Sequence, residues 1–189
     1  MPRQLSTVLS DAVLAISVIH FVYNVFFTNF FAALGLGIQG AAALAGTVRF
    51  SMSDPDRIIK EYHQLFSWLA QVAGLPLLAI GFAHTNAPVL VSFNFLFMIG
   101  AVVATRFADP PTRKLITEAT AGFGMLTIIF CCLININIWG LIGATIYVVS
   151  GTTIGSEGYT HGVPRVDILH YFLAIGNEFF RMSLTYYDL

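Results

Sequence analysis

Stretches of apolar residues alternate along the chain with short polar or proline-containing breaks. A helix needs about 20 residues to cross the hydrocarbon core of a bilayer, and seven apolar segments approach or reach that length. Their expected bounds are residues 8–28, 30–48, 62–82, 89–105, 115–134, 138–154 and 166–184. The pattern therefore predicts an all-α membrane protein, a bundle of seven transmembrane helices joined by short loops.

The third segment contains a proline, Pro76, in its interior. Proline has no backbone N–H and its ring crowds the preceding turn, so one helical hydrogen bond is lost. We therefore expect a kink in the third helix at this point.

The last segment is long enough to cross a bilayer and yet carries several polar residues. Asp167, His170, Asn177 and Arg181 follow one another at intervals of three, seven and four residues, which places them on one stripe of a helix. A charged side chain that faces hydrocarbon costs roughly 2.5–3.5 kcal/mol. The stripe must therefore face protein or water, which predicts a polar interior in the bundle.

Composition supports an integral membrane protein. Hydrophobic residues make up 57% of the 189 residues and charged residues only 10%, whereas charged residues make up about 25% of a typical soluble domain. This length leaves room for a single transmembrane domain, residues 1–189, and for no separate soluble domain. A net charge of −1 offers no basic surface for nucleic acid. Cys131 and Cys132 are adjacent in an apolar run, which predicts buried thiols and no disulfide framework.

The distribution of lysine and arginine predicts the orientation, because these residues concentrate in cytoplasmic loops. When seven helices are threaded, eight of the nine basic residues fall on the side of the amino terminus. These eight are Arg3, Arg49, Arg57, Lys60, Arg106, Arg113, Lys114 and Arg165. Arg181 alone falls on the other side. The amino terminus is therefore expected in the cytoplasm and the carboxyl terminus in a lumenal or extracellular space.

Small residues at intervals of three or four predict close helix packing in two segments. The second segment contains Ala33, Gly37 and Ala41, and the sixth contains Gly140 and Gly143. Small side chains let the backbones of membrane helices approach closely. These two helices are expected to be central in the bundle.

Ionisable residues near the cytoplasmic ends of the helices form a first candidate site. Asp11, Glu118 and Asp167 are each expected about one turn inside the membrane, and His170 at a similar depth. Carboxylate and imidazole groups suit general acid and base catalysis. If the protein is an enzyme, we expect Asp167 and His170 to be the acid/base pair, assisted by Glu118 or Asp11. The alternative is that these groups are hydrated at the interface, where acidic residues stabilise helix starts. No metal site is predicted.

A second set of polar residues is expected near or beyond the midplane, and we assign it to ligand binding. This set is His20, Gln71, Asn94, Asn177 and Glu178. A lipid head-group pocket, proton transfer and ion passage are all compatible with such residues. The alternatives are that His20 is a hydrogen-bonded histidine within the bundle, and that Glu178 pairs with Arg181 three residues later.

Several motifs of well-known membrane and hydrolytic enzymes are absent from the sequence. There is no G-x-S-x-G, no H-E-x-x-H, no phosphate-binding loop and no arginine-rich helix. These absences argue against a serine hydrolase, a zinc protease, a nucleotide-driven pump and a voltage sensor. No cofactor is expected.

Two stretches near the end of the chain resemble a known family. G-A-T-I-Y-V-V-S ends at Ser150, and H-Y-F-L-A ends at Ala174 after an intervening loop. Together they resemble the end of the YhhN-type lysoplasmalogenase family, membrane hydrolases that cleave the vinyl ether bond of lysoplasmalogens. That family has eight helices, aspartate after the serine and glutamine after the alanine, whereas this chain has Gly151 and Ile175 there. The resemblance implies a related fold more than the same reaction.

Three functions are compatible with this sequence. The first is a small, non-catalytic multi-pass membrane protein that binds membrane lipids or another integral membrane protein. The second is a lipid-metabolising membrane hydrolase of the lysoplasmalogenase type. The third is a small transporter or channel, which is disfavoured because only one segment has an internal proline break. The expected location is the endoplasmic reticulum or another endomembrane.

Overall fold

The computed structural model describes residues 4–186, and almost all of them are helical. The elements in chain order are α1 (Leu5–Val25), α2 (Phe30–Ser51), α3 (Arg57–Leu69), the π-helical turn η1 (Ala70–Gly74), α4 (Leu75–Ala83), α5 (Pro88–Phe107), α6 (Pro110–Ile134), α7 (Ile138–Val149), the π-helical turn η2 (Ser150–Ile154), β1 (Tyr159–Thr160), β2 (Val163–Pro164) and α8 (Arg165–Tyr186). β1 and β2 pair as a short antiparallel hairpin.

Helices that could cross a membrane dominate the structure. Within residues 4–186, five are long and apolar enough: Leu5–Val25, Phe30–Ser51, Arg57–Ala83, Pro88–Phe107 and Pro110–Ile134. The third of these comprises α3, η1 and α4. Ile138–Ile154 is a shorter apolar helix, and α8 has 22 residues that include charged ones. The prediction of a helical, multi-pass membrane protein is confirmed at this level.

The helix starts follow the punctuation of the sequence. Asn29 caps α2, since its side chain accepts a hydrogen bond from the backbone N–H of Ala32 at 3.1 Å. Asn137 caps α7 in the same way, through the backbone N–H of Gly140. α5 and α6 begin with proline, whose missing N–H costs nothing in the first helical turn.

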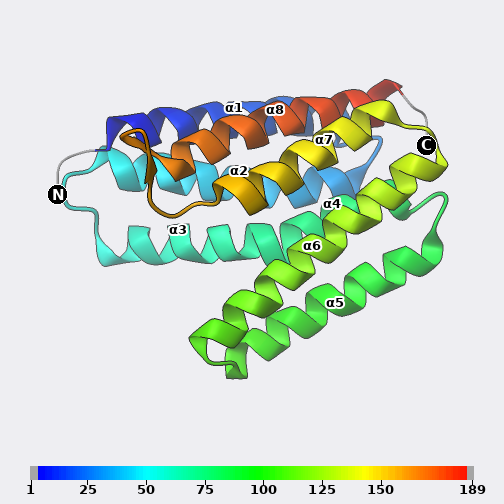
Figure 1. Cartoon of the computed structure of the whole chain (residues 1–189), viewed down its shortest axis with the longest axis horizontal. Helices are drawn as coiled ribbons and strands as arrows, with labels where there is room; N and C mark the ends of the chain where they lie inside the picture. Colours follow the sequence, from blue (N-terminus) through cyan, green and yellow to red (C-terminus); the bar gives the residue numbers. More distant parts are fainter. Residues whose placement is uncertain (1–3, 187–189) are drawn as a thin grey trace.

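Successive long helices run in opposite directions (Figure 1). The start of α1, the α2–α3 and α5–α6 connections and the β1–β2 hairpin lie toward one end, which we call the hairpin end. The α1–α2, α4–α5 and α6–α7 connections and the end of α8 lie toward the other, which we call the distal end. α1 and α8 lie side by side and run in the same direction.

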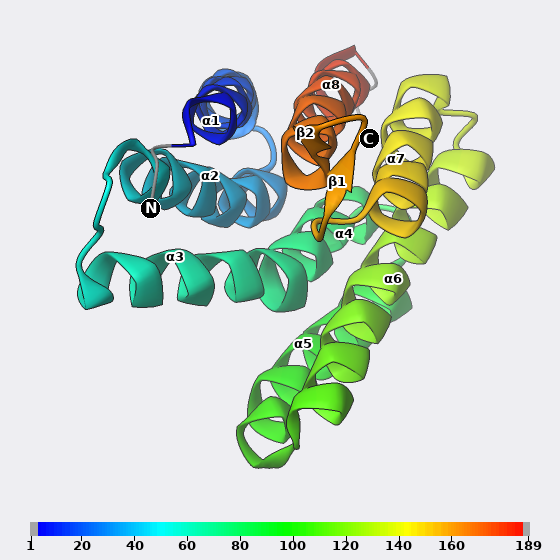
Figure 2. The same cartoon turned by 60° about the vertical axis from the view of Figure 1, so that its left-hand side comes forward.

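The hydrophobic core lies in the distal half of the bundle. Its largest fully buried side chains include Phe21, Leu36, Phe82, Ile128 and Phe180. The hairpin half is packed more loosely, since α3 has no buried residue. Figure 2 shows α5 and the start of α6 diverging from α1, α2 and α8. The helices therefore pack tightly at the distal end and spread apart at the hairpin end.

Where a kink was expected at Pro76, the structure has a π-helical turn, η1, that ends two residues before this proline. The backbone N–H of Leu75 bonds to the carbonyl of Ala70, five residues back. Pro76 has no N–H to offer the turn before it, so the helix widens there. Within residues 4–186 the other π-helical turn, η2, lies at the end of α7 and interrupts no long helix.

Glycines on α2 and α7 allow close approach, although not all at the expected positions. A Cβ added to Gly35 would lie 2.5 Å from the backbone oxygen of Gly74 and 2.7 Å from the backbone nitrogen of Leu78. A Cβ on Gly143 would lie 2.8 Å from Phe180. Gly37, however, has nothing within 4 Å of such a Cβ. The expectation that Gly37 mediates close packing is therefore wrong, because α2 turns the face of Gly35 toward η1 and α4.

Candidate functional site

Acidic, hydroxyl and imidazole side chains from α1 and α8 meet near the hairpin end. α1 contributes Ser10 and Asp11, and α8 contributes Asp167 and His170. Nδ1 of His170 lies 3.1 Å from Asp11 Oδ1 and 3.3 Å from Ser10 Oγ. Ser10 Oγ also donates a hydrogen bond to Asp167 Oδ1 at 3.3 Å. The parallel packing of α1 and α8 thus joins two predicted residues of α8 with one predicted residue of α1. We call Ser10, Asp11, Asp167 and His170 the hairpin-end cluster.

The hairpin-end cluster is buried. Asp11 and Asp167 are each 1% exposed, so neither carboxylate reaches the surface in this conformation. Oδ2 of each carboxylate is buried without a hydrogen-bond partner among the described residues. Asp11 Oδ2 lies against α2, where a Cβ on Gly46 would come within 2.4 Å of it. Gly46 therefore leaves the space that the Asp11 carboxylate fills.

The geometry of the cluster limits its chemistry. In a nucleophilic triad the carboxylate and the hydroxyl contact opposite nitrogens of the imidazole ring. Here Asp11 and Ser10 both contact Nδ1 of His170, so Ser10 is not arranged as a nucleophile activated by this histidine. The two carboxylates and the imidazole can hold or exchange a proton among themselves. No group of three or more metal-ligating residues forms within residues 4–186.

Glu118 lies apart from the hairpin-end cluster. It is on α6, with its side chain 58% exposed and 3.9 Å from Lys114 one turn earlier. The buried side of α6 is formed by small and hydroxyl residues such as Thr117, Thr120 and Gly124, so Glu118 faces outward. Similar depth in the membrane therefore did not bring Glu118 together with Asp11 and Asp167.

A second polar network lies deeper in the bundle and ties four helices together. Asn177 of α8 donates to Ser17 Oγ of α1 at 3.0 Å and to Gln39 Oε1 of α2 at 3.1 Å. The hydroxyl of Tyr147 on α7 lies 3.0 Å from Gln39 Oε1 and also contacts Asn177 Oδ1. All four residues are buried. Both polar atoms of the Asn177 side chain are thus engaged within the protein, which makes the network a link between helices.

Gln39 and Tyr147 were not predicted as members of this network. Gln39 is the only amide side chain in α2, among small apolar residues. An amide on a helix face rich in glycine and alanine is a usable signal, because it must find a partner wherever that face packs. The sequence alone gives no indication that the partner is Asn177.

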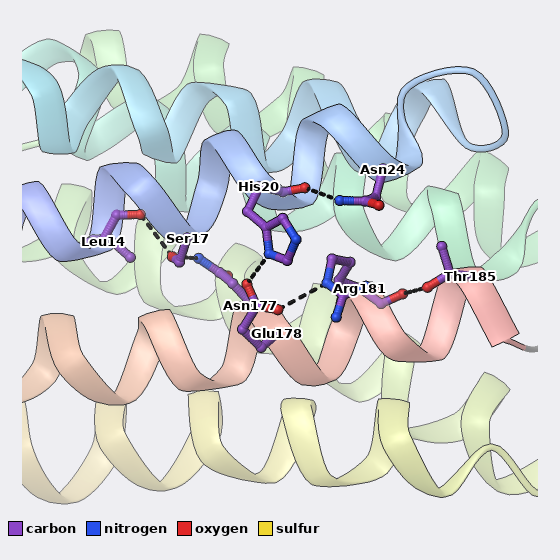
Figure 3. A network of polar contacts seen from close by, with 8 residues as sticks. All are labelled: Leu14, Ser17, His20, Asn24, Asn177, Glu178, Arg181 and Thr185. Atoms are coloured by element: carbon purple, nitrogen blue, oxygen red, sulfur yellow. Dashed lines mark hydrogen bonds and ion pairs between the residues drawn. The ribbon is translucent and has the colours of Figure 1, made fainter.

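The third set of polar residues lies on the outside of the bundle, between α1 and α8 (Figure 3). Nδ1 of His20 is 2.9 Å from Glu178 Oε1, and Nε of Arg181 donates to Glu178 Oε2 at 2.9 Å. The His20 and Glu178 side chains are 51% and 37% exposed. The expected pair of Glu178 with Arg181 is present, and His20 extends it across to α1.

This ionic set lies within the length of the helices and not at their ends. His20 precedes the last residue of α1, Val25, by five positions. At 1.5 Å per residue this is about 7–8 Å inside the distal end of the helix. Glu178 precedes Tyr186, the last residue of α8, by eight positions. Partly exposed charged groups at this depth would face the acyl chains of a bilayer if nothing covered them.

A groove of about 400 Å³ leads away from the ionic set along the two helices. It is lined by Val13, Ile16, Ser17, His20, Tyr171, Ala174, Ile175 and Glu178. Small-molecule sites have volumes of roughly 300–1,000 Å³, so the groove is large enough for a small ligand. Its two ionisable residues, His20 and Glu178, lie toward the distal end of the bundle, and Val13 and Tyr171 line the opposite part. We call it the α1/α8 groove.

The other two residues assigned to ligand binding lie elsewhere. Asn94 of α5 is fully buried and donates to Thr127 Oγ1 of α6 at 3.0 Å. Gln71 is exposed on η1, where its side chain donates to the backbone oxygen of Ser67 at 3.3 Å. Of the predicted ligand-binding residues, His20 and Glu178 line the α1/α8 groove. Gln71 and Asn94 share their depth but face other directions.

Comparisons of the chain with protein-family models, with curated proteins and with solved structures find no match. A function for this protein therefore has to be argued from the geometry of the three polar sets and the α1/α8 groove.

Proposed function

We propose that the protein is a non-catalytic, multi-pass membrane protein that binds a membrane lipid in the α1/α8 groove. The observation that carries this proposal is the position of the His20–Glu178 pair. It is partly exposed on the outer surface of the bundle, five residues before the last residue of α1 and eight before the last residue of α8. Ionisable side chains within membrane spans are costly and usually mark binding sites or pathways.

The shape of the groove favours a lipid over a partner helix. Membrane helices pack closely where small residues line the interface. The exposed outer surfaces of α1 and α8 instead carry bulky side chains, among them Ile16 at 66%, Tyr23 at 83% and Ile175 at 49% exposed. Small Ala174 lies at the bottom of the groove and is 6% exposed. An open groove between bulky side chains fits a flexible chain better than a second helix.

A lipid-metabolising hydrolase is the second function that we consider, because the hairpin-end cluster brings acid and base groups together. Asp11, Asp167 and His170 are in contact or linked through Ser10. The burial of both carboxylates and the shared contact on Nδ1 of His170 argue against direct attack on a substrate. We therefore assign the hairpin-end cluster to the packing of α1 against α8.

We further propose that all seven helices cross the membrane, with the hairpin end in the cytoplasm. The alternating directions of the helices support this proposal (Figure 1). Basic residues within the described chain, among them Arg49, Arg57, Arg113 and Arg165, adjoin connections at the hairpin end, in keeping with the positive-inside rule. Arg3, which also entered the sequence prediction, lies outside the described residues.

The proposed orientation predicts which loops an impermeant thiol reagent reaches. In a chain with Cys131 and Cys132 replaced by alanine, a cysteine at Thr112 should be labelled only from the cytoplasmic side of sealed vesicles. A cysteine at Asn86 should be labelled only from the opposite side. Both positions are exposed and next to helix ends, so the reagent has access in either case. Labelling of both from the same side would rule out the seven-crossing arrangement.

Filling the α1/α8 groove should displace bound lipid. Ile16→Trp places a large side chain at a groove residue that is already 66% exposed, so the core is undisturbed. We expect lipid that copurifies with this variant, measured by mass spectrometry, to fall to less than about a tenth of the wild-type amount, since a filled pocket cannot bury a ligand.

The matched control is Ile19→Trp, on the same helix, 59% exposed and outside the groove lining. It should retain the wild-type amount of lipid. Equal lipid content in the wild type and both variants would contradict the proposed function. An enzyme of the lysoplasmalogenase type would instead lose turnover in Asp167→Asn while its lipid content stayed unchanged.

A further inference from the structure

We infer that the ligand of the α1/α8 groove is a single-chain amphiphile with an anionic head group, either a carboxylate or a phosphate. This inference rests on the lipid binding proposed above and names the chemical class of the lipid. It is carried by the hydrogen-bonding groups that remain available at the polar end of the groove, by the direction of the groove and by its size.

The carboxylate of Glu178 has little capacity left for a ligand. Oε1 is paired with Nδ1 of His20 and Oε2 with Nε of Arg181, each at 2.9 Å. Within residues 4–186, the terminal nitrogens of Arg181 and Nε2 of His20 form no hydrogen bond to protein. A guanidinium group only donates hydrogen bonds. A head group that binds here must therefore accept them.

Arginine favours an anion as that acceptor. Its planar guanidinium matches the geometry of carboxylate and phosphate, and such charge-assisted bonds are about twice as strong as neutral ones. Glu178 holds Nε of the guanidinium and so leaves the other edge to a ligand. Arg181 does not line the groove itself, but its contact with Glu178, which does, places the guanidinium beside the groove. Its side chain is only 18% exposed, which restricts its motion.

The direction of the groove matches the two ends of an amphiphile. Arg181 lies three residues beyond Glu178, which is about 4.5 Å closer to the distal end of α8. The rest of the groove is formed by Val13, Ile16, Ala174 and Ile175, which have no polar side-chain atoms, together with Ser17 and Tyr171, which carry hydroxyl groups. A head group at the distal end would thus place its acyl chain against apolar side chains. A volume of about 400 Å³ is near the lower limit for small-molecule sites, so we assign one chain and not two.

The test compares three probes that share one acyl chain and differ in the head group. Palmitate carries a carboxylate, 1-palmitoyl-lysophosphatidate a phosphate, and monopalmitin no charge. Each is titrated against the full-length protein in a non-ionic detergent, and binding is followed by native mass spectrometry. We expect both anions to bind at least about tenfold more tightly than monopalmitin, as the loss of a charge-assisted hydrogen bond implies.

Arg181→Gln should lower the affinity for both anionic probes by about tenfold or more and leave the affinity for monopalmitin unchanged. Arg106→Gln removes the same charge from an exposed position on α5, outside the groove, and should bind all three probes like the wild type. Equal affinities of the wild type for the three probes would overturn the assignment of an anionic head group. So would a loss of affinity in Arg181→Gln that is equal for all three probes. Either result would leave the proposed lipid binding intact. Failure of all three probes to bind, with a membrane protein copurifying in stoichiometric amount, would overturn the lipid-binding function itself.

Discussion

Gly35→Ala is expected to destabilise the bundle by about 2–3 kcal/mol, the upper part of the range for overpacking a tight interior. The added Cβ would lie 2.5 Å from the backbone oxygen of Gly74 and 2.7 Å from the backbone nitrogen of Leu78. Backbone atoms of a helix cannot move aside as a flexible side chain can, so α2 must shift away from η1 and α4. The contact is reciprocal, because a Cβ on Gly74 would come within 2.9 Å of the Gly35 oxygen.

The matched control for Gly35 is two residues away on the same helix. Gly37→Ala adds a methyl group where nothing lies within 4 Å, and alanine is the better helix former by about 1 kcal/mol. Thermal unfolding in detergent should therefore show a drop of roughly 5–10 °C for Gly35→Ala, at about 2–4 °C per kcal/mol for a chain of this length, and no drop but a rise of up to about 4 °C for Gly37→Ala. Equal midpoints for the two variants would mean that α2 does not pack against η1 as described.

Asn177→Leu is expected to cost about 2–3 kcal/mol of stability, although leucine is similar in size to asparagine. The substitution removes the donor to Ser17 Oγ and to Gln39 Oε1 and one acceptor of the Tyr147 hydroxyl. A buried polar group that loses its partner costs about 1–3 kcal/mol. Individual hydrogen bonds between membrane helices average only about 0.6 kcal/mol, so most of the effect comes from the unpaired groups that remain.

Asn24→Leu is the control for Asn177. Asn24 is half-buried near the end of α1, and among the described residues its side chain bonds only to the backbone oxygen of His20 in the same helix. Surface substitutions of this kind usually change stability by less than about 0.5 kcal/mol. The two variants are compared by thermal unfolding and by their content of copurified lipid. Loss of lipid from Asn177→Leu at an unchanged midpoint would show that Asn177 binds a ligand and does not link helices.

Helix boundaries follow largely from local chemistry, and the bounds expected from the sequence lie within five residues of those observed. Asn29 and Asn137 cap helices through backbone groups three residues away. Pro76 acts on the turn directly before it. Interactions of this range depend on a few neighbouring residues, so they can be inferred without knowledge of the fold.

The direction that each polar side chain faces depends on tertiary packing and could be predicted only in part. Asn177 and Arg181 are four residues apart and were placed on one stripe. Four residues advance the helix by about 40° beyond a full turn, and that offset is enough to put Asn177 in the core and Arg181 beside the α1/α8 groove. Glu118 shows the same limit, since its outward direction is set by the small residues on the opposite side of α6.

Asn177 and Glu178 are consecutive on α8, but their side chains face different surroundings. Asn177 belongs to the buried network that links four helices, and Glu178 lines the α1/α8 groove. A ligand that binds in the groove beside Glu178 therefore also restrains the helix segment that holds Asn177. Any ligand that binds only the folded chain raises its stability in proportion to the logarithm of the ligand concentration. If the groove binds a lipid as proposed, preparations stripped of lipid by prolonged detergent washing should consequently unfold at lower temperature than preparations that retain it.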